Sequence, residues 1–458
     1  MDILSERKAF VKRKRADSGL ALDCEKASLP GAVSQRACVF CGARVVLNPI
    51  TDALHLIHGP IGCASYTWDI RGSLSSESEI YRHSFSTDMR EKDVIFGGEK
   101  KLEKALEELI NKFQPRAVFV FSTCIVGIIG DDLEAVCKAA ERKFGLPVIP
   151  VQSSGFEGTK SSGYRAAGDA IFRLICKGQA FRSEKEEKIP FSVNMLGDFN
   201  LAAELWIVKD YLKRIGIKVI ATMTGDGKVK DIQDAPCARL NILQCAGSMG
   251  YLARRLKEEL DIPFMKISFF GELDTINSLR AIAGFFEDRR IRENTERLIR
   301  EESSRYSSRI EKYKKGIEGK RIAIYVGGAF KAKSLIKSFR ALDAEVVFVG
   351  TQTGNRDDYE EISAMTNPGT IIADDTNPVE LAKCLGEQKA DLLVGGVKER
   401  YLAYKLGIGF CDHNHERKYP LAGFVGDLEF TREIYTSIQS PVWKILKREK
   451  DAGTLRYC

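Results

Sequence analysis

Twelve cysteines give this sequence its clearest potential for chemistry. A disulfide framework is typical of small secreted domains, and a chain of 458 residues is not of that kind. Two interpretations remain, namely buried structural thiols and thiolates that bind metal. The cysteines are scattered over the chain, at Cys24, Cys38, Cys41, Cys63, Cys124, Cys137, Cys176, Cys237, Cys245, Cys384, Cys411 and Cys458.

Three cysteines lie in segments that resemble loops, where a thiolate can approach a metal cluster. Cys124 follows the apolar run 117–121, and Cys63 ends a segment that contains Gly and Pro. Cys38 forms a Cys-x-x-Cys pair with Cys41, a spacing found in half of a zinc site or in a redox pair. No second such pair completes a zinc site, so packing stays open as an alternative to ligation.

The other notable cysteines divide into one ambiguous residue and two core candidates. Cys245 follows the apolar run 240–243 and precedes small residues, which leave room for a bulky ligand. Ligation and packing are equally open for it. Cys137 and Cys176 lie in apolar helical segments, and we expect both in the core.

Two histidines, His413 and His415, lie close to Cys411 in a polar segment. Imidazole and thiolate are common metal ligands, so a metal site is one interpretation. An exposed polar loop is the alternative, which we favour slightly. Neither histidine is assigned a role.

The elements that must position these residues repeat one pattern, a β-branched apolar run, a turn and an amphipathic helix. Apolar runs at 117–121, 191–196 and 321–326 indicate buried parallel strands. The alternation predicts an α/β protein of three Rossmann-like domains with parallel sheets, whose ligands bind beyond the carboxyl ends of strands. The loops concerned follow Phe121, Leu196, Leu243, Val326 and Val394.

The chain is expected to divide into an arm and three domains. The arm, residues 1–35, is expected to be basic and partly disordered. The domains are a first α/β domain over 36–182, a second with Cys245 over 183–318, and a third over 319–458. A long polar helix is predicted at about 291–317, before the third domain begins.

Net charge is +7, which is mild for this length. The basic residues that gather in one place are Arg7, Lys8, Lys12, Arg13, Lys14 and Arg15. Binding of nucleic acid or of an acidic partner is one interpretation, and a solvated arm is the favoured one. We expect no nucleic-acid partner.

Several classes of protein are disfavoured by what the sequence lacks. It has no apolar run of about 18 residues, so no transmembrane helix or membrane partner is expected. It has no apolar segment near its start of the kind found in secretory signals, so we expect a cytoplasmic protein. It has no G-x-x-x-x-G-K-[ST] motif, so no nucleotide site is evident.

A set of ordered motifs points further. They are His58-Gly-Pro-Ile-Gly-Cys63, Phe85-Ser-Thr-Asp88, Glu91-Lys-Asp-Val-Ile-Phe-Gly-Gly98, Cys124 through Gly130-Asp131-Asp132, Val148-Ile-Pro-Val151 with Gly155-Phe156, Gly225-Asp-Gly227, Gln244-Cys245 with Ser248-Met249, Tyr325-Val-Gly-Gly328 and Gly423-Phe-Val-Gly426. In this order they resemble the α-type subunits of the nitrogenase component 1 family, from about residue 36 to 445.

The resemblance implies three Rossmann-like domains and a homologous β-type subunit, paired in an α2β2 tetramer. It also implies that Cys38, Cys63 and Cys124 ligate a [4Fe–4S] cluster at the subunit interface. A four-iron cluster usually takes four thiolates, so the partner would supply the fourth. Cys41 is an extra that the family pattern does not require.

A second metal site separates the catalytic members of the family from its cofactor-maturation members. In catalytic subunits a cysteine and a histidine bind the cofactor from two sides. Cys245 matches the cysteine, and the histidine stands directly before Gly-Phe-x-Gly. Ala422 stands at that histidine position and cannot coordinate a metal. Tyr164 stands where catalytic subunits carry a histidine near the substrate. Both differences favour a maturation scaffold, and a catalytic oxidoreductase is the alternative.

On this resemblance the chain would hold an iron–sulfur precursor of the iron–molybdenum cofactor at Cys245. Molybdenum and homocitrate would be inserted there, with the nitrogenase iron protein, a cluster donor and apo nitrogenase as further partners. Arg71, Lys331 and Lys333 would bring positive charge to the anionic cluster or homocitrate, with a surface cation as the alternative for each. No turnover reaction of its own is expected, and the final heterometal stays open.

Overall fold

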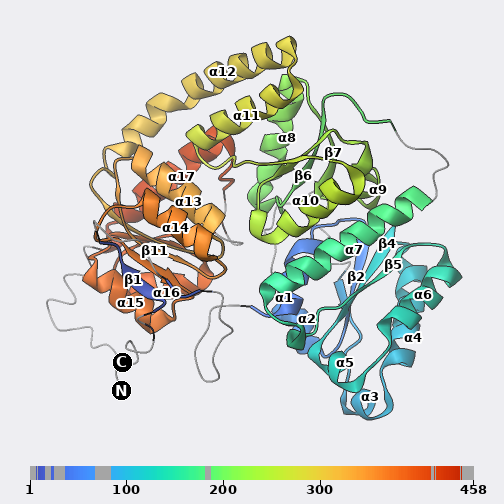
Figure 1. Ribbon diagram of the computed structural model, residues 1–458. Coiled ribbons are helices and arrows are strands. Elements are labelled where there is room, and N and C mark those ends of the chain that lie inside the picture. The colour runs from blue at the N-terminus through green and yellow to red at the C-terminus, as the bar shows by residue number, and fades with distance from the viewer. Residues whose placement is uncertain are drawn as a thin grey trace. The chain divides into compact units, whose positions relative to one another are not determined.

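The computed structural model describes residues 7, 9–15, 22–24, 37–67, 84–180, 187–413, 417, 419–443 and 445. They form two compact units (Figure 1). The cysteine unit contains residues 37–267 and 280–298. The C-terminal unit contains residues 268–279, the residues from 299 onward and the described residues before 37. No helix among the described residues is long and apolar enough to span a membrane.

The first sheet of the cysteine unit has four strands, all parallel. Its order is β3 (Ser84–Ser86), β2 (Ala53–His58), β4 (Ala117–Ser122) and β5 (Val148–Val151). Every residue of β2 and β4 is buried, as expected of central parallel strands with both faces covered.

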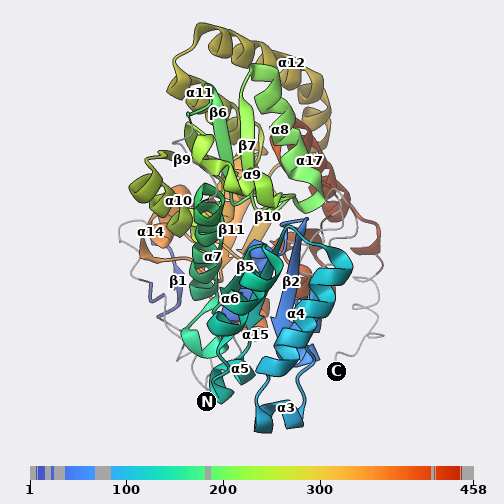
Figure 2. The same ribbon diagram turned by 90° about the vertical axis from the view of Figure 1, so that its right-hand side faces the viewer.

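Alternate residues of β4 face two different cores. Phe119 and Phe121 belong to the core formed with α1 (Val39–Leu47) and α7 (Lys160–Ala180). Val118 and Val120 belong to the core formed with α4 (Glu99–Phe113) and α6 (Leu133–Phe144). The latter two helices lie in front of β2 and β5 in Figure 2. The two-residue period of the strand therefore builds a three-layer arrangement.

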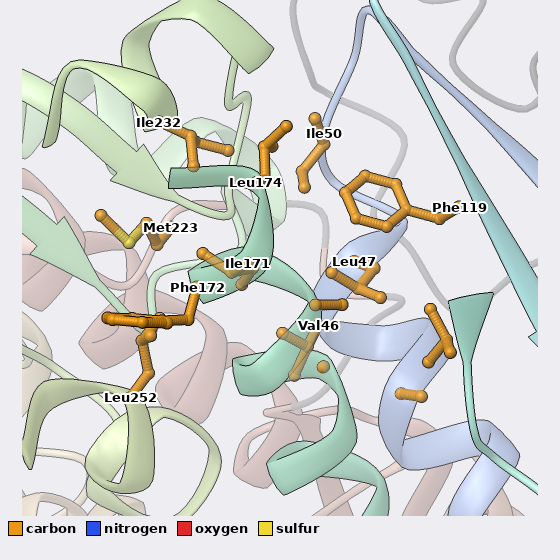
Figure 3. Packing of buried hydrophobic residues seen from close by; sticks show 14 of the residues in the cluster. Val46, Leu47, Ile50, Phe119, Ile171, Phe172, Leu174, Met223, Ile232 and Leu252 are labelled. Carbon is orange, nitrogen blue, oxygen red and sulfur yellow. The ribbon is translucent and has the colours of Figure 1, made fainter. Parts of the chain in front are cut away.

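The second sheet of this unit is also four-stranded and parallel. Its order is β7 (Lys218–Met223), β6 (Ser192–Leu196), β8 (Leu240–Leu243) and β9 (Phe264–Lys266). The helices α8 (Glu204–Ile215), α9 (Val229–Gln233) and α10 (Ala246–Leu260) accompany it, with η3 (Leu201–Ala203) and η4 (Ala235–Cys237) between strands. Figure 3 shows Ile171 and Phe172 of α7 packed between Val46 of α1 and Met223 of β7, so one apolar cluster joins both sheets.

Two glycines allow α1 and α7 to cross closely. A Cβ atom on Gly42 would lie 2.2 Å from the carbonyl oxygen of Lys160, and one on Gly163 would lie 2.0 Å from the carbonyl oxygen of Val39. Both obstacles are backbone atoms, which cannot turn aside. The crossing therefore requires glycine at both positions, and it fixes α1, which follows Cys38, against the start of α7.

The C-terminal unit holds a six-stranded sheet. Its order is β1 (Val11–Arg13), β12 (Ile371–Asp374), β11 (Glu345–Thr351), β10 (Arg321–Val326), β13 (Leu392–Gly395) and β14 (Gly409–Asp412), parallel except for β1. Its helices are α13 (Ala329–Ala341), α14 (Arg356–Met365), α15 (Pro378–Glu387), α16 (Val397–Leu406) and α17 (Gly423–Ile438). The expected α/β class with parallel sheets is confirmed. The helices α11 (Glu272–Phe286) and α12 (Arg289–Lys314) run through both units.

Part of the expected N-terminal arm is ordered on this sheet. Strand β1 pairs antiparallel with the edge strand β12. Arg7 donates to Glu380 at 3.0 Å, and the Lys14 ammonium donates to two carbonyl oxygens, of Ser363 and Thr366, at the end of α14. Arg7 and Lys14 are thus engaged with a carboxylate and with carbonyl groups at a helix C-terminus, respectively.

Candidate functional site

The three cysteines of the expected interface cluster lie at the starts of short helical segments rather than on open loops. Cys38 is the N-cap residue of α1, Cys63 lies in α2 (Ile61–Tyr66), and Cys124 is the first residue of α5 (Cys124–Ile129). Strands β2 and β4 are parallel neighbours, with His58 paired to Ser122. Because both strands end at the same edge of the sheet, the segments with Cys63 and Cys124 emerge side by side.

The thiols of Cys124 and Cys38 lie within electrostatic range of the Cys63 thiol. Burial raises the pKa of the Cys63 thiol, and the charges of Cys124 and then of Cys38 raise it further. Among the described residues, no three His, Cys, Asp or Glu side chains are close enough to hold one metal ion.

Gly155 closes one side of Cys124. Its backbone N–H donates to the Cys124 Sγ at 3.3 Å, and a Cβ atom there would lie 2.8 Å from that sulfur. Gly155 opens the short helix η2 (Gly155–Glu157), after Ser154. Backbone N–H donors to sulfur are one of the groups that tune iron–sulfur clusters. Gly155 belongs to one of the ordered motifs, but the sequence did not indicate that it contacts the Cys124 sulfur.

A buried polar network holds the ends of β2 and β4 together. His58 Nε2 lies 2.9 Å from Asp131 Oδ2, and Asp131 also accepts from the backbone N–H of Gly98 at 3.0 Å. His58 Nδ1 lies 3.1 Å from the Thr87 hydroxyl, and Thr123 donates to the His58 carbonyl at 3.0 Å. Burial lowers the pKa of His58, while Asp131 opposes that shift. A neutral imidazole that donates from Nε2 to Asp131 and accepts at Nδ1 from Thr87 satisfies every group.

Cys245, the candidate ligand of the second site, is the N-cap residue of α10 and is half-buried. A Cβ atom on Gly197 would lie 2.7 Å from the Cys245 backbone nitrogen, so Gly197 gives this turn its room. Burial is the main reason that the Tyr164 pKa is raised. Lys160 opposes the shift, and the charge of Cys245 adds to it. The Lys160 ammonium lies 5.8 Å from the Tyr164 ring centroid.

Comparison with known proteins identifies the family. The family described as nitrogenase component 1 type oxidoreductase matches residues 38–439. The chain belongs to this family. Similar relatives include the nitrogenase iron–molybdenum cofactor biosynthesis protein NifE of Clostridium pasteurianum, 58% identical over 440 residues, which are 96% of this chain and 95% of that one. NifE of Methanosarcina barkeri is 51% identical over 454 residues, which are 98% of each chain.

Solved structures agree with this assignment. Nitrogenase Cp1 at pH 5 superposes with a TM-score of 0.87 at 29% identity, over 96% of each chain. The same protein at pH 6.5 gives a TM-score of 0.88 at 28% identity. The nitrogenase component 1 fold expected from the sequence is therefore confirmed.

Within this family fold, Ala422 is the buried N-cap residue of α17 in the C-terminal unit. Its backbone pairs with Phe270 in an isolated bridge, and Gly423 donates its N–H to the Phe269 carbonyl at 2.7 Å. The position where catalytic members of the family carry a histidine thus holds a methyl group, which offers no ligand atom.

The predicted cations of the family site differ in their surroundings. The Lys333 ammonium contacts Asp358 at 3.1 Å and Glu361 at 2.6 Å, so two carboxylates neutralise it. The Lys331 charge acts on His413, whose pKa is held well below its usual value, first by burial and then by Lys331 and Arg417. Arg71 lies outside the described residues.

Two expectations from the sequence were wrong. His413 is not in an exposed loop, because only 2% of it is accessible and its ring packs edge-on against Phe270 at 5.1 Å. Cys176 is exposed rather than in the core, whereas Cys137 is fully buried as expected. His415 lies outside the described residues.

Large apolar side chains are exposed on the helices that carry Cys63 and Cys124 and on two short helices that contact α5. They belong to α2, α3 (Glu91–Phe96), α5 and η2, and α5 contacts both α3 and η2. The residues are Ile61, Val94, Ile95, Phe96, Ile128 and Phe156, and Phe96 is 85% exposed. Such a group of apolar side chains is typical of a surface that a protein partner covers.

Proposed function

We propose that this chain is a scaffold subunit on which the nitrogenase iron–molybdenum cofactor matures, as the name of its NifE relatives states for them. The observation that carries the proposal is the residue type at two positions of the family pattern. Cys245 offers a thiolate at a helix start, whereas Ala422, at the position matched to the family's histidine, offers no ligand atom. A cargo cluster held by one firm ligand can be released, and a catalytic cofactor needs to be fixed at both ends.

Cys38, Cys63 and Cys124 are the proposed ligands of a [4Fe–4S] cluster, with the fourth thiolate from the partner. The donor set fits, because Cys124 and Cys38 both act electrostatically on Cys63 and Gly155 presents an N–H to the Cys124 sulfur. When bound, such a cluster takes up and releases single electrons. The chain's own contribution is twofold. The His58–Asp131 network orients the thiolates, and Gly155, which has no side chain, leaves space beside the Cys124 sulfur.

The iron–sulfur precursor is the proposed cargo at Cys245. Tyr164 of α7 provides a phenol in electrostatic range of that sulfur, and the Lys160 ammonium of the same helix lies 5.8 Å from the Tyr164 ring centroid. Lys331 is the proposed cation of the C-terminal unit for the cluster or for homocitrate, together with Arg71. Lys333 is the weaker member of that proposal, because Asp358 and Glu361 already pair with it.

The proposed assembly is an α2β2 tetramer with a homologous, NifN-like β-type subunit. The exposed apolar residues beside the cluster cysteines, such as Phe96, Ile128 and Phe156, support a covered surface there. The nitrogenase iron protein, a cluster donor and apo nitrogenase are the further proposed partners. Molybdenum and homocitrate are proposed to arrive while the precursor is held.

A catalytic oxidoreductase is the second candidate. It is favoured by the family description and by the close likeness to the nitrogenase Cp1 structures. It is disfavoured by Ala422 and by Tyr164, because neither position supplies the histidine that the catalytic members carry. The two candidates differ in whether the complex by itself turns over substrate.

Complementation of cofactor-free nitrogenase tests the proposal. The chain is purified anaerobically with its β-type partner, and then added with iron protein, ATP, molybdate and homocitrate to the apo enzyme. Acetylene reduction should appear with the wild type and with Cys176→Ala, and should be lost with Cys245→Ala. Cys176 is a fair control because it is an exposed cysteine of the same unit. Substrate reduction at nitrogenase-like rates by the complex alone would establish the oxidoreductase instead.

A further inference from the structure

Arg44 is a buried cation in α1 that has no carboxylate partner among the described residues. Only 1% of it is accessible, and it is among the largest fully buried side chains. Its Nε donates to the Thr67 hydroxyl at 3.4 Å, and its Nη2 donates to the Ser84 hydroxyl at 3.2 Å. Its third nitrogen, Nη1, has no hydrogen-bond partner in the described part of the chain.

This environment is costly for a guanidinium. Burial lowers the pKa of Arg44 to about 9, and the Cys41 thiol opposes that shift. At neutral pH the group still carries its charge. The nearby Phe121 ring, 5.2 Å from Cζ, gives only a weak attraction, and hydroxyl groups carry no charge. A buried charge persists when an opposite charge compensates for it.

Arg44 is linked to the cluster cysteines by a short path. It lies in the helix that Cys38 caps. The Thr67 hydroxyl, which accepts from Arg44, donates to the Cys63 carbonyl at 3.3 Å. One residue, Thr67, therefore joins the buried guanidinium to the backbone of a proposed cluster ligand.

We propose that Arg44 is the buried counter-charge of the cluster held by Cys38, Cys63 and Cys124, and that it raises the reduction potential of that cluster. The inference rests on the proposed function, since it needs the cluster to be present. A thiolate-bound iron–sulfur cluster carries net negative charge, and its potential depends on the charges around it. Uptake of one electron adds a further negative charge, which a neighbouring cation stabilises more than it stabilises the oxidised state. Arg44 thus acts as a tuning residue and is not a ligand.

A purely structural role makes a different prediction. On that view Arg44 only ties α1 to Thr67 and Ser84 through hydrogen bonds, and a neutral side chain of similar length would leave the cluster's potential unchanged. The potential therefore separates the two roles, whereas stability and iron content alone do not.

The test is a redox titration of the interface cluster, monitored by electron paramagnetic resonance, in the anaerobic complex with the β-type partner. Arg44→Met should lower the midpoint by about 59 mV, which is about a tenfold change in the one-electron equilibrium constant. Arg44→Lys keeps the charge and should stay near the wild type. Arg173→Met is the matched control, because Arg173 lies in the same unit but is half-exposed and pairs with Glu134.

The outcomes are separable. An Arg44→Met complex with full iron content and a wild-type midpoint would overturn the inference. If that variant yields no soluble complex, Arg44→Gln removes the charge and keeps an N–H donor, and it should show the same lowering; an unshifted midpoint there overturns the inference equally. A wild-type complex with no cluster on these cysteines would instead refute the proposed function, on which the inference rests.

Discussion

At the scale of single residues, the candidate site depends on three positions at which a particular chemical group is missing. Gly155 has no side chain, so its N–H reaches the Cys124 sulfur at 3.3 Å. Ala422 has no ligand atom, so this position cannot anchor a metal. Arg44 has no carboxylate partner among the residues that the structure describes, and we propose that its charge acts on a cluster. The sequence alone shows that position 422 is alanine. Only the structure shows the Gly155 contact and the surroundings of Arg44.

Replacement of Gly155 by Ala should displace the Cys124 sulfur, because the new Cβ atom would lie 2.8 Å from it. We expect about a tenfold or greater loss of cluster affinity, the usual size for outer contacts of a metal ligand. Iron per chain in the anaerobic complex, with the visible absorption of the cluster, is the measurement. Gly284→Ala is the control, since a Cβ atom there meets nothing within 4 Å. Equal iron content in the two variants would show that the Gly155 contact does not matter.

At the scale of elements, regular structure with strong periodicity was predictable and short elements were not. The strand predicted at 117–121 lies within β4 (Ala117–Ser122), and the polar helix at about 291–317 corresponds to α12 (Arg289–Lys314). The helices α2 and α5 have six residues each, too few for a period to emerge, so Cys63 and Cys124 were expected on loops. Strand β1 has three residues and owes its place to pairing with β12.

The candidate cysteines came from a resemblance, and their role as ligands stays a prediction. Cys38, Cys63 and Cys124 were chosen from ordered motifs, and in the structure Cys124 and Cys38 act electrostatically on Cys63. His413 and Cys176 were misplaced because tertiary packing decides burial for a polar segment and for one face of a helix. Arg44 lies in an apolar helix, and its burial reflects contacts with Thr67 and Ser84, which lie far along the chain.

The crossing of α1 and α7 is an element-scale feature that a single methyl group can test. Gly163→Ala would place Cβ 2.0 Å from the Val39 carbonyl oxygen, so the helices must separate. We expect a loss of about 1–3 kcal/mol in the free energy of unfolding, the usual penalty of overpacking. Chemical denaturation of the purified chain measures it. Gly386→Ala, at an open helical position, should cause no loss, and equal stability of the two variants would contradict the crossing.

At the scale of the whole molecule, buried titrating groups of two kinds shift in opposite directions. His58 in the cysteine unit and His413 in the C-terminal unit are buried, with pKa values below the usual 6.5. Asp427 of the C-terminal unit is partly buried, and this desolvation raises its pKa to about 6. The histidines and the aspartate therefore push the acid stability of the protein in opposite directions. The stability of the wild type alone does not isolate either effect, whereas a comparison with a variant does.

The pH dependence of the His58 contribution follows from its sign. Its pKa is lower in the folded chain than in the unfolded chain, because burial outweighs Asp131, with Lys101 adding to the lowering and Asp93 opposing it. Below about pH 6.5 the unfolded chain binds the proton more readily, so the stabilisation by neutral His58 is lost as pH falls. The loss of stability caused by His58→Gln should thus be largest above about pH 7. It should shrink by up to about 1.4 kcal/mol per pH unit below about pH 6.5. Urea unfolding of wild type and variant between about pH 5 and pH 8 measures this difference, in which the contribution of Asp427 cancels. A difference that grows on acidification would mean that His58 is charged in the fold and paired with Asp131 as an ion pair.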